Sequence, residues 1–258
     1  MTHAIGIIPA RMASSRLPGK PLAPICGIPM LGHVYLRSKR SQALDEVYIA
    51  TCDQEICDYG KKIGAKVIMT ADTHERATDR SAEAMGKIEG MTGKKADVIV
   101  MIQGDEPLLI PQMIDEVMVP LQEDPEVMVA NLMSPLKNQQ EYEDPNEVKV
   151  VVDQQGFALY FSREPIPSLK KGGKDFLMMR QLCIIPFRRD FLLTFNNLPP
   201  TPLEIIESID MLRLLEHGYK VKIVPTQSDT YSVDTPEDLE KVEQLMKKDS
   251  LFSQYSKD

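Results

Sequence analysis

Short apolar runs alternate with amphipathic segments over the first half of the chain. The apolar runs are rich in β-branched side chains, as buried strands are, and the first contains Ile5, Ile7 and Ile8. Further strands are expected at Glu46–Thr51, Lys66–Met69, Asp97–Ile102 and Val127–Leu132. Apolar residues at helical spacing predict a helix at Pro29–Ser41, and Asp53 can cap a helix that runs to Lys62. Further helices are expected at Asp79–Glu89 and Pro111–Leu121. This alternation predicts an α/β fold in which helices pack over a mostly parallel sheet.

The alternation stops between about residues 134 and 200. Strands are expected there at Val148–Val152, Phe157–Phe161 and Leu182–Phe187. Beyond them the pattern predicts a helix, a strand and a helix at Pro202–Leu215, Val221–Val224 and Pro236–Lys247. We interpret residues 134–200 as a β-rich insertion within a single domain that spans residues 1–248. A polar tail at residues 249–258 is expected to fray.

A basic loop follows the first predicted strand. Pro9 interrupts that strand because proline lacks a backbone donor, and the loop then carries Arg11, Arg16 and Lys20. Guanidinium groups bond phosphate oxygens in pairs and an ammonium acts as a point charge, so the loop suits a polyanion such as a triphosphate. A solvated basic loop is the alternative interpretation. The chain has neither G-x-x-x-x-G-K-[ST] nor G-x-G-x-x-G.

Composition narrows the class of protein. The formal net charge of -8 over 258 residues argues against broad binding to nucleic acid or a membrane surface. The four cysteines show no C-x-x-C pair and no zinc-like spacing with the histidines, so reduced thiols are expected. No apolar run approaches the ~20 residues of a membrane span, and the first residues lack the features of a signal peptide. We therefore expect a cytoplasmic protein that binds no nucleic acid and no membrane.

Two carboxylates follow strand-like segments. Asp105 lies in Q-G-D-E-P after the most apolar strand, and Asp234 lies in S-V-D-T-P-E-D-L before the last helix. Carboxylates are hard oxygen ligands, and Mg²⁺ takes one or two of them together with phosphate oxygens and water. Helix capping is the alternative for both segments, with Asp234 or Thr235 as the cap and Pro236 in the first turn.

The order of residues in these segments resembles the CMP-sugar synthetases, and among them the 3-deoxy-manno-octulosonate (Kdo) cytidylyltransferases. The first similar segment is I-P-A-R-M-A-S-S-R-L-P-G-K-P-L at residues 8–22. Q-G-D-E-P, Y-F-S-R, P-L-E-x-x-E and V-D-T-P-E-D-L follow in the order that the family has, so the resemblance spans roughly Ile5 to Met246. It implies a Rossmann-like nucleotidyltransferase, a homodimer, and Mg²⁺-dependent transfer of CMP from CTP to a 2-keto-3-deoxy sugar acid.

The resemblance also implies roles for individual residues. Arg16, Lys20, Asp105 and Asp234 form the implied catalytic set, in which Asp105 and Asp234 hold the metal. The implied nucleotide-binding residues are Pro9, Ala10, Arg11, Ser15, Arg16, Lys20, Thr78, Asp79, Arg80 and Gln103. The implied sugar-binding residues are Gln103, Arg163, Gln181 and Glu207.

The chain departs from the family pattern in two segments. H-E-R-A-T-D-R at residues 74–80 has Arg76 and Ala77 where the family has serine and glycine. R-Q-L-C-I-I-P-F-R at residues 180–188 has Gln181 at a histidine position and Ile185 and Phe187 at tyrosine positions. Losing an imidazole and two phenols makes the sugar pocket less polar, which can change specificity.

Two alternatives therefore stay open, the first of which is a nucleotidyltransferase that acts on another acceptor. The acceptor could be another ulosonic acid. It could also be a sugar 1-phosphate, for which the cations near Gln181 are Arg180, Arg188 and Arg189. A nucleotide-binding protein without catalytic activity is the alternative from a different class, and the presence of both Asp105 and Asp234 counts against it.

Overall fold

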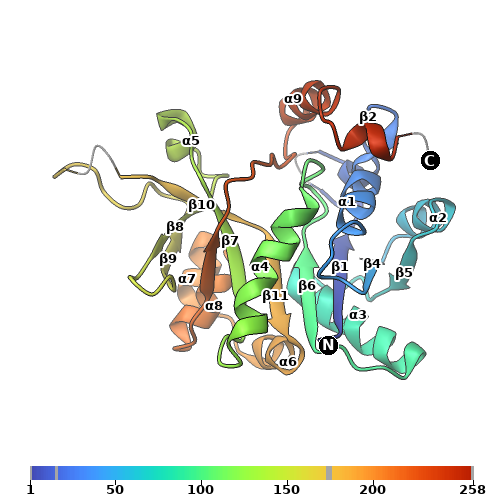
Figure 1. The fold of residues 1–258 in the computed structure, drawn as a ribbon, viewed down its shortest axis with the longest axis horizontal. Helices are drawn as coiled ribbons and strands as arrows, with labels where there is room; N and C mark the ends of the chain where they lie inside the picture. Colours follow the sequence, from blue (N-terminus) through green and yellow to red (C-terminus); the bar gives the residue numbers. More distant parts are fainter. Residues whose placement is uncertain (1, 15–16, 173–175, 257–258) are drawn as a thin grey trace. The chain divides into compact units, whose positions relative to one another are not determined.

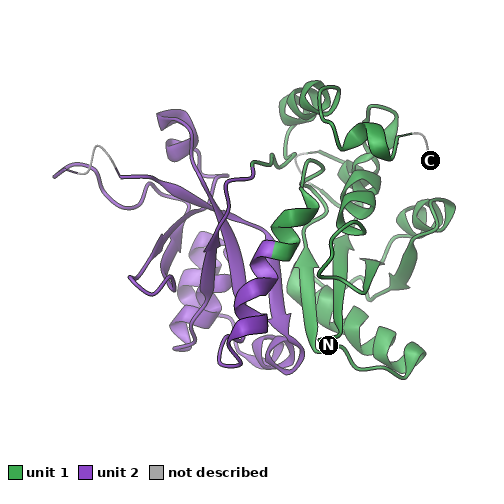
Figure 2. Cartoon of the chain, viewed as in Figure 1, with its two compact units in different colours: residues 1–115, 229–258 green, residues 116–228 purple. Residues whose placement is uncertain are grey.

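The computed structural model describes residues 2–14, 17–172 and 176–256 and divides into two compact units. Unit 1 consists of residues 1–115 and 229–258, and unit 2 consists of residues 116–228 (Figure 2). Unit 2 therefore begins earlier and ends later than the insertion expected at residues 134–200. The boundary before unit 2 falls inside helix α4 (Pro111–Glu123), so a break in secondary structure does not mark it.

Parallel strands form the centre of unit 1. They lie in the order β6 (Val98–Ile102), β1 (Ala4–Ala10), β4 (Glu46–Thr51) and β5 (Lys66–Met69) (Figure 1). The side chains of Ile5, Ile7 and Ile99 are fully buried, as the continuous apolar runs predict. The α/β prediction with a mostly parallel sheet is confirmed for this part of the chain.

Helices and short elements complete unit 1. Helix α3 (Ala77–Thr92) packs on all these strands, α1 (Met30–Ser38) packs on β1 and β4, and α2 (Gln54–Lys62) packs on β4 and β5. The 3₁₀ turn η1 (Lys20–Leu22) and the small hairpin of β2 (Pro24–Ile25) and β3 (Ile28–Pro29) precede α1. Near the end of the chain lie α9 (Pro236–Met246) and the 3₁₀ turn η2 (Phe252–Gln254).

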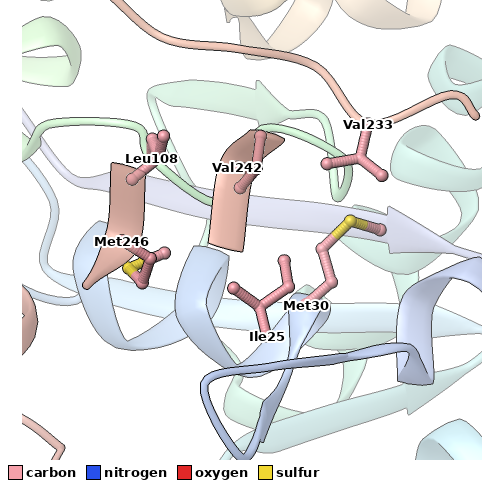
Figure 3. Close-up of a cluster of buried hydrophobic side chains, with 6 residues drawn as sticks. All are labelled: Ile25, Met30, Leu108, Val233, Val242 and Met246. Carbon is pink, nitrogen blue, oxygen red and sulfur yellow. The ribbon is translucent and has the colours of Figure 1, made fainter. Parts of the chain in front are cut away.

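A buried apolar cluster joins α9 to the hairpin and to α1. Val242 and Met246 of α9 pack with Ile25, Met30 and Leu108, and Val233 completes the cluster (Figure 3). Because Val233 lies next to Asp234 in the chain, this packing also fixes the backbone that carries the second carboxylate.

Residues 249–256 of the tail that was expected to fray pack onto α1 instead. Tyr255 is 1% exposed, its hydroxyl lies 2.8 Å from Nδ1 of His33, and it accepts a 2.8 Å hydrogen bond from Nε of Arg37. Asp249 pairs with the same buried guanidinium at 2.6 Å. The prediction was wrong because the partners of these tail residues lie near the start of the chain, where local polarity gives no sign of them.

Unit 2 contains a mixed sheet. Its strands lie in the order β12 (Lys222–Pro225), β7 (Ala130–Pro135), β10 (Met179–Leu182), β8 (Lys149–Val152) and β9 (Ala158–Ser162). The β12–β7 pair is parallel and the other pairs are antiparallel. The remaining elements of this unit are α5 (Gln139–Glu143), β11 (Ile184–Arg188), α6 (Arg189–Asn197), α7 (Pro202–Glu207) and α8 (Met211–Glu216).

Two predicted elements of unit 2 are each divided. The strand expected at Leu182–Phe187 is in fact the end of β10 followed by β11. The helix expected at Pro202–Leu215 is α7 followed by α8, with Ser208 between them at a left-handed φ of 54°. Arg163 donates to the backbone carbonyls of Glu207 and Ser208, so a distant side chain satisfies the end of α7. Hydrophobic spacing cannot reveal such a contact.

Candidate active site

A cavity of about 370 Å³ lies in unit 1, where the loops after three parallel strands converge. Pro9 and Ala10 line it from the end of β1, which continues through Pro9, and Arg11 lines it from the loop that follows. The loop after β6 contributes Gln103 and Asp105. The other lining residues are Ala13, Ser14, Lys20, Pro21, Met30, His74, Glu75, Arg76, Ala77, Arg80, Gly104 and Asp234. The structure thus brings together eight of the predicted residues, namely Pro9, Ala10, Arg11, Lys20, Arg80, Gln103, Asp105 and Asp234.

A hydrogen bond near the start of the basic loop and a glycine near its end set the course of its backbone. The carboxylate of Asp53 accepts a 2.7 Å hydrogen bond from the backbone amide of Met12, so Asp53 anchors this loop and does not cap α2 with its side chain. Gly19 has a left-handed φ of 71° immediately before Lys20, a conformation that favours glycine. The predicted residues Ser15 and Arg16 lie outside the described part of the chain.

Lys20 lies between the two predicted metal ligands. Its Nζ is 2.9 Å from Oδ2 of Asp105 and 2.9 Å from Oδ1 of Asp234. The side chains of Lys20, Asp105 and Asp234 are 12%, 23% and 20% exposed, so solvent screens these ion pairs only partly. Burial alone would lower the pKa of Lys20, but the charges and hydrogen bonds of the two carboxylates outweigh it and raise that pKa above its ordinary value.

The capping alternatives are resolved by the local geometry. Thr235 is the N-cap of α9 and forms a capping box with Asp238, whose carboxylate accepts from the backbone amides of Thr235 and Asp234. The carboxylate of Asp234 accepts a 2.9 Å hydrogen bond from Nζ of Lys20. Asp105 lies six residues before Pro111, the first residue of α4, which is too far upstream to cap that helix.

The donor set suits a divalent cation that is shared with a ligand. Oδ1 of Asp105 is buried and has no hydrogen-bond partner in the part of the chain that the structure describes, and an unsatisfied buried acceptor is costly. Among the described residues there is no cluster of three or more histidine, cysteine or acidic side chains that could hold a metal. Mg²⁺ commonly takes only one or two carboxylates and fills its other positions with phosphate oxygens and water. Asp105 and Asp234 therefore fit a magnesium ion bound together with a nucleotide.

The loop between β5 and α3 forms another wall of the cavity. Arg80 is 2% exposed and donates to the hydroxyl of Thr70 and to the carbonyls of Ala71 and His74. Its guanidinium therefore shapes this loop in addition to lining the cavity. Thr78 is fully buried and does not line the cavity, and Asp79 lies in the first turn of α3, where Arg76 is the N-cap.

The carboxylate of Glu83 in α3 holds this loop in place through hydrogen bonds. Glu83 pairs with His74 and accepts a 2.9 Å hydrogen bond from the backbone amide of Ala71. Burial raises the pKa of Glu83, but hydrogen bonds from Lys87, Ala71 and His74 outweigh it and bring that pKa to about 2. His74, Glu75, Arg76 and Ala77 were not predicted as site residues, although their place after a strand in the H-E-R-A-T-D-R segment was a usable signal.

Two predicted sugar contacts, Arg163 and Glu207, lie together in unit 2. Glu207 accepts from the hydroxyl of Ser162 at 2.9 Å and from the backbone amide of Arg163 at 2.8 Å. The Arg163 guanidinium donates to the carbonyls of Glu207, Pro145 and Ser208 at 2.6, 2.8 and 3.3 Å. Three of its five N–H donors are thus used within the protein, and one remains on each terminal nitrogen.

Gln181 belongs to a different network in unit 2. Its side-chain amide donates to Oδ1 of Asn131, which is fully buried in β7 and in turn donates to the carbonyl of Leu182. Asn131 was not predicted, and its only sequence signal is a polar residue within an apolar strand.

The three arginines suggested for a sugar phosphate all have protein partners. Arg180 pairs with Glu147 at 2.6 Å, Arg189 pairs with Asp190 at 2.6 Å, and Arg188 donates to the carbonyls of Leu121, Asp124 and Val127. These contacts argue against a phosphate-bearing acceptor.

The fold and the site are those of a nucleotidyltransferase, and sequence comparison narrows the class. The chain belongs to the cytidylyltransferase family, whose sequence pattern matches residues 5–223. The 3-deoxy-manno-octulosonate cytidylyltransferase of Syntrophotalea carbinolica is 46% identical over 245 residues, which cover 92% of this chain and 96% of the relative. The enzyme of the same name from Geobacter metallireducens is 44% identical over 246 residues, with 92% and 94% coverage. The resemblance inferred from the motifs is confirmed.

A solved structure agrees with this assignment, and a more distant one shares the fold. A CMP:2-keto-3-deoxy-manno-octonic acid synthetase complexed with CTP has a TM-score of 0.88 and 38% identity, covering 96% of this chain and 99% of that one. A 4-diphosphocytidyl-2C-methyl-D-erythritol synthase shares the fold at a TM-score of 0.64 and 12% identity. Within the described part of the chain, no helix combines the length and apolar character needed to cross a membrane.

Proposed function

We propose that this protein transfers CMP from CTP to a 2-keto-3-deoxy sugar acid, Kdo or a close analogue, with release of pyrophosphate. The observation that carries the proposal is the convergence of Lys20, Asp105 and Asp234 in one cavity together with Arg11, Arg76 and Arg80. A cavity that combines these four cations with the carboxylates of Asp105, Asp234 and Glu75 suits a triphosphate and its metal. The names of the similar relatives support CTP as the nucleotide and Kdo as the acceptor.

The proposed reaction is an in-line displacement at phosphorus. The anomeric hydroxyl of the sugar acid forms a bond to the α-phosphorus of CTP and gives up its proton to water. The bond from that phosphorus to the pyrophosphate oxygen breaks, and pyrophosphate leaves with the electron pair. The protein contributes position and charge, and no nucleophilic side chain is required. Arg11 and Lys20 would neutralise the phosphates, and the backbone of Pro9 and Ala10 would contact the cytosine base. Arg16, outside the described residues, stays a predicted phosphate contact.

We further propose that Asp105 and Asp234 hold Mg²⁺ when nucleotide is bound. The unsatisfied Oδ1 of Asp105 and the hard oxygen donors of both residues support this assignment. When bound, the ion would supply positive charge that neutralises the phosphates and makes the sugar hydroxyl more acidic. Asp105 and Asp234 themselves would orient the phosphates by fixing where the shared cation lies.

The acceptor contacts proposed from the resemblance are Gln103, Arg163, Gln181 and Glu207. The N–H group left on each terminal nitrogen of Arg163 supports a bidentate contact with a sugar carboxylate. The hydrogen bond from Gln181 to Asn131 would leave the second amide hydrogen and the carbonyl of Gln181 for a sugar hydroxyl.

A homodimer in the cytoplasm belongs to the same proposal. Apolar side chains on β9 and α7 support the assembly, because Leu159, Ile205 and Ile206 are 61%, 63% and 78% exposed. Glu207 ties these two elements together through Ser162, so the apolar groups lie on connected elements. Light scattering coupled to gel filtration tests the assembly, and Ile206→Glu should convert a dimer into a monomer. A monomeric wild-type protein would reject the dimer.

Pyrophosphate release with CTP, Mg²⁺ and Kdo tests the function, with the 8-amino analogue and a nine-carbon sialic-type acid as parallel acceptors. Turnover with Kdo would mean that Gln181 and Ile185 are tolerated substitutions. Saturable CTP binding without turnover on Kdo would support CTP as the nucleotide and would mean that the acceptor is another sugar acid. Absence of both CTP binding and turnover would reject the proposal.

A further inference from the structure

The position of Lys20 sets a condition on metal binding. Its ammonium lies 2.9 Å from a carboxylate oxygen of Asp105 and 2.9 Å from one of Asp234. A cation that bridges two carboxylate oxygens occupies the region in which a divalent ion held by both residues would lie. The Lys20 ammonium and such an ion repel each other, so the ion binds the two carboxylates more weakly while the ammonium lies between them.

The charges of the three groups make this competition strong. Two carboxylates carry two negative charges, and the ammonium leaves a net charge of minus one for an incoming ion. All three side chains are mostly buried, at 12–23% exposure, so water weakens the repulsion less than it would on an open surface. Lys20 follows Gly19 in a short 3₁₀ turn, and its long side chain can move its ammonium without rearranging that backbone.

A triphosphate offers Lys20 another partner. The same cavity is lined by Lys20, Arg11 and Arg76, and phosphate oxygens placed there would compete with the carboxylates for the ammonium. Once Lys20 pairs with phosphate, Asp105 and Asp234 regain both negative charges. Their affinity for a divalent cation then rises.

We propose that Lys20 holds the place of the divalent cation between Asp105 and Asp234 until nucleotide phosphates draw it away, so that metal and nucleotide bind cooperatively. This inference rests on the proposed function only in taking a nucleotide as the source of the phosphates. By linkage, the metal strengthens nucleotide binding by the same factor by which the nucleotide strengthens metal binding. Lys20 therefore pairs with the two carboxylates before nucleotide binds and with the phosphates afterwards.

Titration with Mn²⁺ in the absence of nucleotide, followed by electron paramagnetic resonance of the free ion, tests the first half. Lys20→Met should bind Mn²⁺ at least about tenfold more tightly than wild type, because a full positive charge is removed at hydrogen-bond distance. Lys20→Gln should show the same gain and keeps a polar side chain should the methionine variant fold poorly. Arg11→Met is the matched control, since it removes one cation from the same cavity, and its gain should be much smaller.

The location of the bound ion is tested in the same assay. Adding Asp234→Asn to Lys20→Met should abolish the gain, because one of the two carboxylates is then neutral. Equal Mn²⁺ affinity in wild type and both Lys20 variants would overturn the proposal. An equal gain in Arg11→Met would also overturn it, because the effect would then be one of general charge.

Cooperativity is measured as the factor by which Mn²⁺ raises the affinity for CTP without a sugar acceptor. This factor should be smaller in Lys20→Met than in wild type, since only direct contact between metal and phosphate remains. An unchanged factor would overturn the coupling. Failure of wild type to bind CTP at all would instead reject the proposed function, whereas the nucleotide-free titration would still decide the position of Lys20.

Discussion

The backbone amide of Val233 donates a hydrogen bond to the backbone carbonyl of Asp105, with 2.9 Å between nitrogen and oxygen. Val233 immediately precedes Asp234, so this bond joins the two segments that supply the carboxylates. Val233 is also fully buried in the cluster with Val242 and Met246. The spacing of the two carboxylates therefore depends on how α9 packs against the rest of unit 1.

Neutralising Asp105 should stop turnover without unfolding the protein. Asp105→Asn keeps the size of the side chain and removes its charge, so we expect the rate of pyrophosphate release to fall by about 10²-fold or more, the scale of one preorganised electrostatic group. Asp72→Asn, at an exposed position outside the cavity, is the control and should stay active. Wild-type activity in Asp105→Asn, with a normal melting curve, would refute its role as a ligand.

Shortening Met246 should weaken both the fold and the site. Met246 is fully buried in the cluster that contains Val233, and Met246→Ala should lower the free energy of unfolding by about 2–5 kcal/mol. The KM for CTP should rise as well, because Asp234 follows Val233. Met91→Ala is the matched control, since Met91 is 75% exposed near the end of α3. Urea denaturation measures the stability of both variants and steady-state kinetics measures their KM for CTP. Equal values for Met246→Ala and Met91→Ala would contradict the prediction.

The contribution of Glu83 to stability should depend on pH. Its pKa of about 2 in the folded protein lies below the ordinary value of 4.5, so the unfolded chain binds the proton more tightly. This stabilisation is therefore full above about pH 4.5 and is lost as the pH falls toward 2. The difference in unfolding free energy between wild type and Glu83→Gln should shrink over that window in urea titrations. A difference that is constant across the window would contradict the prediction.

Gln181 should affect the sugar acid and leave the nucleotide unaffected. Gln181→Ala removes the side chain that donates to Asn131, and we expect the KM for the accepted sugar acid to rise by about threefold to tenfold, the value of one hydrogen bond. The KM for CTP should stay unchanged and serves as the internal control. A rise in the KM for CTP of the same size would indicate general damage to the fold.

Local sequence patterns were sufficient to predict the structure of segments that depends mainly on their own residues. The strands at residues 46–51 and 66–69 have the predicted bounds, because short runs rich in β-branched residues indicate strands without knowledge of their partners. The strand ends also identified most of the site, since the loops after β1 and β6 and the segment of Asp234 all contribute to the cavity. Thr235 was already a candidate cap by its position before Pro236.

Contacts between distant segments decided the features that the patterns did not reveal. Ser208 divides a helix that looked continuous, and Tyr255 is buried against His33 and Arg37 although the tail is polar. Asp53 could be read as a helix cap but instead holds the backbone of Met12. In each case the deciding partner lies far away in the sequence.

The sequence by itself determined the alternation of strands and helices, the basic loop, the two candidate carboxylates and the family. These depend on hydrophobic spacing and on the order of residues within short motifs. Only the tertiary structure decided that Lys20 bridges Asp105 and Asp234, that Arg80 shapes the β5–α3 loop, and that Val233 joins the carboxylate segments. The physical reason is that ion pairs and buried hydrogen bonds act over a few ångströms in space, and their partners here come from segments widely separated along the chain.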